Sequence, residues 1–80
     1  MSGFRVTTTV EVSKELGAYG EDRRQQVEQA LDLLSDESAL VLGTADGQGR
    51  YAELMPGLAF FWIVLERPRL VVVWQTATLS

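Results

Sequence analysis

The side chains that could carry chemistry in this sequence are arginines, carboxylates, hydroxyls and aromatics, because it contains no histidine and no cysteine. Its serine and threonine hydroxyls therefore lack the usual general base that would turn them into nucleophiles. A metal site made of carboxylates alone needs several converging oxygens, and Asp46 stands alone in its expected loop. We expect neither a metal site nor a cofactor.

Two groups of charged residues could form a surface site. Arg50, Arg67 and Arg69 flank the late strands and could contact an anion, although arginines at strand ends and turns are more often simply solvated. The carboxylates recur at four-residue steps, which places them on one face of a helix. This acidic stripe comprises Glu28, Asp32 and Asp36. A solvated helix face is the simpler interpretation, and a docking surface for a basic partner is the more specific one.

The elements that position these residues begin with a strand and two helices. Residues 4–12 alternate in polarity and are rich in β-branched side chains, which predicts a half-buried strand. Ser13 is a suitable cap for a short helix at residues 14–19. Residues 21–35 predict a longer amphipathic helix, with an apolar stripe at the spacing of one helix face. The stripe is Val27, Ala30, Leu31 and Leu34.

The second half of the chain predicts β-structure. Asp46-Gly47 and Pro56-Gly57 are turn sequences between apolar runs. The expected strands are residues 39–44, 50–55, 58–65 and 70–76. Residues 58–65 are apolar at every position, on both faces of the expected strand, which is typical of a central strand. The element order β-α-α-β-β-β-β, with its helices before its run of strands, indicates an α+β fold with an antiparallel sheet of four to five strands.

Length and composition narrow the class of protein. The chain has 80 residues, so we expect one domain spanning residues 1–80. With 46% hydrophobic and 22% charged residues, the composition is that of a globular protein. Seven basic against eleven acidic residues give a net charge of −4, which argues against nucleic acid as a partner. No signal sequence is visible and no apolar run is long enough for a membrane span, so we expect a cytoplasmic protein.

Two stretches of the sequence resemble the RelE/ParE superfamily of small toxins from bacterial toxin–antitoxin pairs. The helix EDRRQQVEQALDLLSDES is similar to the second helix of that family. The stretch GRYAELMPGLAFFWIVLERPRLVVVWQT is similar to its strand entry, glycine turn, aromatic central strand, charged turn and valine-rich last strand. The resemblance runs from residue 4 to residue 76 and implies the same order of elements as the pattern above.

The resemblance also implies a choice between functions. Arg50 and Tyr51 match the strand entry and are the candidates for catalytic residues if the chain is an endoribonuclease that cuts messenger RNA on the ribosome. The position at which such enzymes usually carry an arginine is occupied here by residues 58–60, which are apolar, and residues 75–80 lack the family's basic or aromatic end. We therefore favour a non-catalytic protein-binding module, like the gyrase-directed branch, that acts through an antitoxin or a cellular protein target.

An acidic inhibitor, for example a phage-derived nucleic-acid mimic that uses the acidic stripe, is a further alternative. Such an inhibitor would bind its target through the negative charge of the acidic stripe, whereas the toxin interpretations depend on the residues of the sheet.

One sheet face is left over in this arrangement. The longer helix can cover one face, packing Val27, Leu31 and Leu34 against the side of the first strand that carries Val6 and Val10. The other face would then expose large apolar side chains, more than monomers usually do. We expect a partner there, either a second copy or the amphipathic tail of an antitoxin. The expected anchors are Phe60, Trp62 and Trp74.

Overall fold

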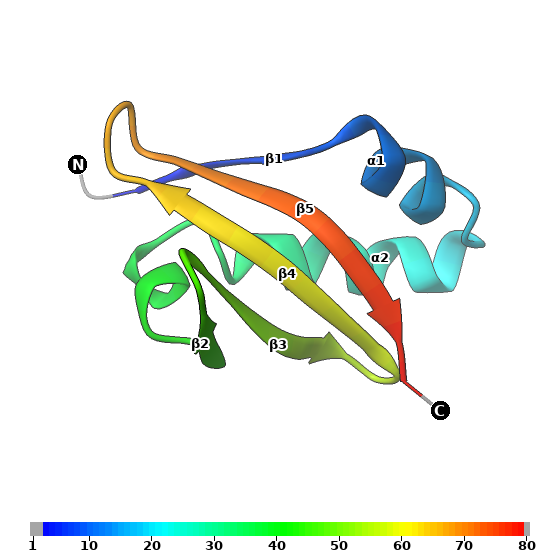
Figure 1. Cartoon of the computed structure of the whole chain (residues 1–80). Helices are drawn as coiled ribbons and strands as arrows, with labels where there is room; N and C mark the ends of the chain where they lie inside the picture. Colours follow the sequence, from blue (N-terminus) through cyan, green and yellow to red (C-terminus); the bar gives the residue numbers. More distant parts are fainter. Residues whose placement is uncertain (1–2, 80) are drawn as a thin grey trace.

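A five-stranded sheet with two helices on one face makes up the fold in the computed structural model, which describes residues 3–79 (Figure 1). The fold is α+β, in the expected element order. Its elements are β1 (Arg5–Thr8), α1 (Val10–Gly17), α2 (Glu21–Asp32), the 3₁₀ helix η1 (Glu37–Leu40), β2 (Thr44–Asp46), β3 (Gly49–Met55), β4 (Leu58–Leu65) and β5 (Leu70–Thr78). No helix within residues 3–79 has the length and apolarity needed to cross a membrane.

The sheet has the strand order β1-β5-β4-β3-β2. As its uniformly apolar sequence predicts, β4 is the central strand. The expectation of a purely antiparallel sheet is wrong at one pair, because β1 runs parallel to β5, with Arg5 opposite Leu70 and Thr8 opposite Val73. The reason is topological: α1 and α2 carry the chain away from β1, and it enters the sheet again at the far edge. The hairpins then bring β5 back alongside β1 in the same direction.

The first strand is shorter than its residue pattern predicts. It ends at Thr8, because Thr9 caps α1 by accepting a hydrogen bond from the Val12 backbone N–H (3.4 Å). Val12 therefore enters the core from a helix, whereas Val10 is 67% exposed and does not share the core face as expected. The β-branched run favoured a strand, and the threonine cap with the packing of Val12 and Leu16 outweighs that preference.

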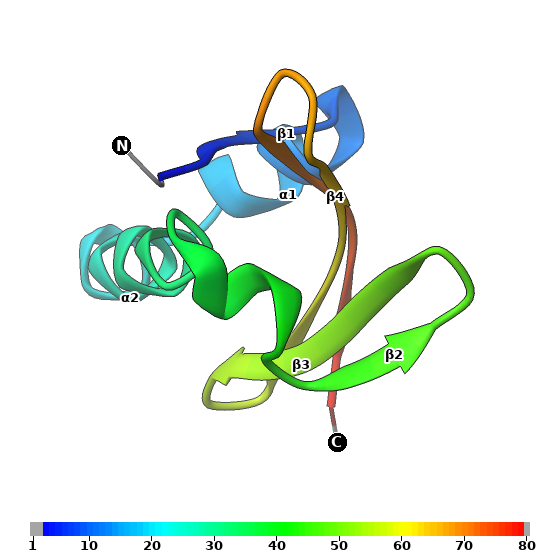
Figure 2. The same cartoon turned by 90° about the vertical axis from the view of Figure 1, so that its left-hand side faces the viewer.

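The core lies between α2 and the covered face of the sheet (Figure 2). Val27, Ala30 and Leu34 of the predicted stripe are buried, and Leu31 is partly buried against them. The helix ends at Asp32 rather than at Ser35, whose hydroxyl donates to the Asp32 carbonyl (2.7 Å). The large side chains on the covered face of the sheet come from β4 and β5. They include Phe60, Trp62, Val71 and Val73.

The segment at residues 39–44 was expected to be a strand and is not. Asp36 caps η1 instead, and β2 begins only at Thr44. The tight turns lie where they were predicted. Gly47 has φ +60° at the first position of the two-residue loop between β2 and β3, and Gly57 has φ +79° after Pro56 between β3 and β4.

Candidate functional site

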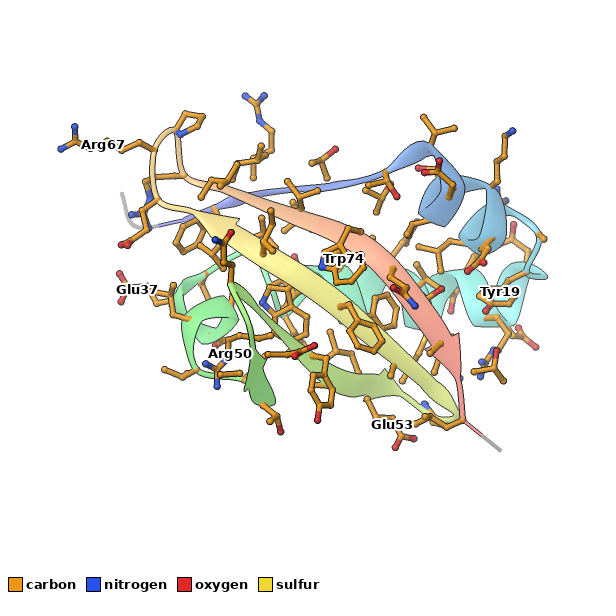
Figure 3. All side chains as sticks on the ribbon, viewed as in Figure 1. Tyr19, Glu37, Arg50, Glu53, Arg67 and Trp74 are labelled. Atoms are coloured by element: carbon orange, nitrogen blue, oxygen red, sulfur yellow. The ribbon has the colours of Figure 1, made fainter. Side chains whose placement is uncertain are left out.

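The sheet face opposite α2 is the candidate functional surface. In Figures 1 and 3, α2 lies behind the sheet and no described element covers the side that faces the viewer. Because side chains alternate between the two faces of a strand, the neighbours of the buried core residues point to this side. We call it the open face. Its central members are Tyr51, Phe61, Ile63, Val72 and Trp74.

Three aromatic rings form a continuous strip across the open face, from β3 over β4 to β5. Tyr51 and Phe61 lie opposite each other in the sheet and stack, with ring centroids 5.4 Å apart and planes at 26°. Phe61 and Trp74 follow at 5.8 Å and 59°. Tyr51 is 37% exposed and Trp74 is 45% exposed. This aromatic strip offers a partner a large, rigid apolar surface.

Trp74 lies at an irregularity in the pairing of β4 with β5. Phe61 pairs with Gln75 and the next residue, Trp62, pairs with Val73, so Trp74 has no partner across the sheet. Such a bulge sets two residues of one strand against one of its partner. Val73 is fully buried, and the alternation of side chains places the next residue, Trp74, on the open face, where it contacts Phe61.

A small pocket adjoins the aromatic strip at the β2–β3 hairpin. Its volume is about 180 Å³, and its lining is Asp46, Gln48, Gly49, Arg50, Phe61, Ile63 and Trp74. Gly49 is needed there because a Cβ at this position would lie 2.4 Å from the Trp62 carbonyl oxygen. In the sequence Asp46 is an isolated loop carboxylate, and only the folded hairpin brings it to the same pocket as Trp74. No local sequence pattern predicts that Asp46 and Trp74 line the same pocket.

Two of the three expected partner anchors are wrong. Phe60 and Trp62 are fully buried in the core, on the covered side of the sheet, and the Trp62 indole Nε1–H donates to the Ala39 carbonyl oxygen (2.9 Å). A partner on the open face cannot contact either ring. Trp74 is the exposed tryptophan, and its position agrees with the expected role without testing it.

The two candidate catalytic residues, Arg50 and Tyr51, lie on opposite faces of β3. The Arg50 guanidinium donates to the carbonyl oxygens of Leu42 (2.7 Å), Gly43 (3.1 Å) and Val41 (3.2 Å). Figure 3 shows Arg50 on the η1 side of the molecule, away from Trp74. The Arg50 side chain therefore holds the connection before β2, and its guanidinium does not point to the same side as the Tyr51 ring.

The late arginines do not form an anion site together. Arg69 lies over the Phe4 ring, 4.2 Å from its centroid, and donates to the Gly3 carbonyl oxygen (3.0 Å). Arg67 points outward from the β4–β5 turn, far from Arg50 in Figure 3. This separation removes the converging positive charge that phosphoryl transfer requires.

The acidic stripe is also divided by the structure. Glu28 and Asp32 are exposed on α2, but Asp36 lies beyond the end of the helix. Its carboxylate accepts the Ser38 backbone N–H (2.8 Å), and hydrogen bonds from the backbone and hydroxyl of Ser38 lower the pKa of Asp36. Within residues 3–79, no group of three or more carboxylates is placed to hold a metal ion.

Comparisons of the chain with protein-family models, curated proteins and solved structures found no match. The RelE/ParE resemblance therefore rests on the two sequence stretches quoted above and on the element order.

Arg50→Ala should destabilise the fold by about 1.5–3 kcal/mol, because a charged donor that serves three carbonyl oxygens is lost. Arg67→Ala is the matched control, since Arg67 is exposed in a turn and its loss should change stability by less than about 0.5 kcal/mol. Urea unfolding followed by circular dichroism measures both. Equal midpoints for the two variants would contradict the structural role of Arg50.

Proposed function

We propose that this chain is a cytoplasmic bacterial protein of the RelE/ParE type that acts without catalysis, by binding a protein partner through the open face of its sheet. The partner is an antitoxin or a cellular protein target. The observation that carries the proposal is the exposed aromatic strip of Tyr51, Phe61 and Trp74. The two sequence stretches and the order β-α-α-β-β-β-β support the family assignment.

The composition of the open face favours binding of a protein over chemistry. Aromatic rings that are rigidly packed and exposed are the side chains that most often dominate interface energy. Apolar neighbours extend the strip, among them Ile63, Val72 and Leu65, of which Leu65 is 41% exposed. Beside the strip the face carries the carboxylates of Asp46 and Glu53, and Arg5 lies at its β1 edge opposite Leu70, so the face offers little of the positive charge that an RNA substrate requires.

A different protein fits this face better than a second copy of the chain. Each copy carries a net charge of −4, and the open face holds Asp46 beside the strip and Glu53 at its β3 end. Pairing two such faces would bring like charges together, which opposes association. Self-association of the chain is therefore a competing outcome of the experiment below.

Trp74→Ser should weaken the complex with the partner by at least about thirtyfold, because truncation of a central aromatic anchor typically costs 2 kcal/mol or more of binding energy. The chain is co-expressed with the product of the neighbouring reading frame, and the complex is measured by light scattering and by calorimetry. Glu28→Gln, on the exposed side of α2, is the control and should bind as the wild type does.

Three results would count against the proposal. They are a complex that tolerates Trp74→Ser, a wild-type chain that binds no neighbour product and stays monomeric, and a chain that associates only with itself. Primer extension on a translated message completes the test. New cleavages inside codons, abolished by Tyr51→Phe, would establish the endoribonuclease alternative instead.

A further inference from the structure

The pocket beside the aromatic strip has the size of a site for one side chain. At about 180 Å³ it is smaller than the clefts that hold cofactors or drug-sized ligands. It lies at the edge of the open face, between the β2–β3 hairpin and the rings of Phe61 and Trp74. A partner segment that lies across the strip can therefore insert a single side chain here.

The lining of the pocket selects for a cation. Phe61 and Trp74 line the pocket, and the face of an aromatic ring carries the negative part of its quadrupole, which attracts ammonium and guanidinium groups. The Asp46 carboxylate adds a full negative charge, and within residues 3–79 it has no ion-pair partner. A carboxylate at an apolar rim repels an anion and leaves its own charge uncompensated beside a neutral side chain.

Arg50 is the one cation that lines the pocket, and its charge is already engaged. Its guanidinium donates to the carbonyl oxygens of residues 41–43 on the other side of β3. It does not form an ion pair with Asp46. The pocket thus has a carboxylate and two aromatic rings in its lining, while the guanidinium of Arg50 is held by backbone carbonyl groups.

We propose that this pocket binds a lysine or arginine side chain of the protein partner, so that the partner segment is basic and apolar. The inference rests on the proposed function and adds the chemistry of the partner. Apolar side chains of the segment cover the aromatic strip, and its cation lies between Asp46 and the rings of Phe61 and Trp74. This pairing of charges also agrees with the net charge of −4.

The test uses two blocked peptides, acetyl-Ser-Val-Lys-Val-Ser-amide and its twin with norleucine in place of lysine, titrated into the isotope-labelled chain. The lysine peptide should bind about three- to thirtyfold more tightly, the range expected from one exposed cation–π contact and one ion pair. Its binding should shift the Trp74 indole N–H and the Gly49 amide, and it should weaken in 0.5 M salt, whereas binding of the norleucine peptide should not.

Two substitutions separate the charge from the fold. Asp46→Asn should reduce the affinity for the lysine peptide by about 1.5- to fivefold and leave the norleucine peptide unchanged. Asp46 lies on β2 opposite Gly49, outside the two-residue loop, and asparagine has nearly the same shape as aspartate, so this variant keeps the fold. Asp32→Asn removes the same charge from the exposed side of α2 and should change neither affinity.

The outcomes distinguish this inference from the proposed function. Equal binding of both peptides at Trp74 would overturn the cation site and leave the apolar docking surface intact. Amide signal changes confined to α2 would overturn the cation site and show that the lysine peptide binds the acidic helix face instead. Failure of both peptides to bind would also overturn it, while the partner complex and its dependence on Trp74 are judged by their own experiment.

Discussion

Trp62→Ala should remove about 3–5 kcal/mol of stability, the range for truncating a buried aromatic residue. A domain of this length has a total stability of about 4–12 kcal/mol, so the variant should be largely unfolded or close to it. Trp62 is fully buried, and its indole N–H bonds to the Ala39 carbonyl oxygen, which ties η1 to the sheet. The loss therefore combines a cavity with an unpaired carbonyl group.

Trp74→Ala is the matched comparison, because it truncates the same residue type where it is 45% exposed. Trp74→Ala should lower the free energy of unfolding by less than about 1 kcal/mol. Urea unfolding followed by circular dichroism gives both values, and Trp62→Phe separates the hydrogen bond from the volume of the ring. Similar midpoints for Trp62→Ala and Trp74→Ala would mean that the core is not where the structure places it.

Gly43→Ala should destabilise the chain by about 2–5 kcal/mol, because it combines backbone strain with overpacking. Gly43 has φ +69°, a conformation that other residues rarely adopt, and an added Cβ would lie 2.1 Å from the Tyr51 carbonyl oxygen. That oxygen belongs to β3, so relief of the clash requires separation of β2 from β3.

Gly47→Ala isolates the strain alone. Gly47 has a similar φ of +60°, but a Cβ there meets nothing within 4 Å. Gly47→Ala should lower the free energy of unfolding by about 1–2 kcal/mol. Unfolding midpoints together with the amide signals of Thr44 and Tyr51 report on the two variants. If both alanines cost the same, the close approach at Gly43 does not hold in solution.

Much of the fold could be predicted from the residues, because its patterns are long or chemically distinctive. The uniformly apolar run of β4 predicts a central strand, and glycine with proline or aspartate predicts both hairpin turns. The pattern of residues 4–12 predicts a longer strand than β1, since alternation and β-branching are also compatible with a capped helix that starts at Val10. Only the packing of α1 in the folded protein decides between a continued strand and a helix at these residues.

The candidate site was less predictable, for a physical reason that concerns β4 and β5. A strand that is apolar on both sides does not reveal which side the helix covers, so Trp62 and Phe60 were assigned to the wrong face. The register shift between β4 and β5 beside Trp74 is not indicated by any residue pattern. The nearness of Asp46 to Trp74 arises from tertiary structure alone.

The parallel pairing of β1 with β5 has a consequence for the way the protein is made. Arg5 lies opposite Leu70, so the sheet closes between residues that are far apart in the chain. Such a contact carries a high entropic cost before it contributes stability, which slows folding. During synthesis, β1 has no strand to join until residues 70–73 have left the ribosome. Until then, the β5 edge that β1 covers in the folded sheet stays open, and an unpaired strand edge favours aggregation.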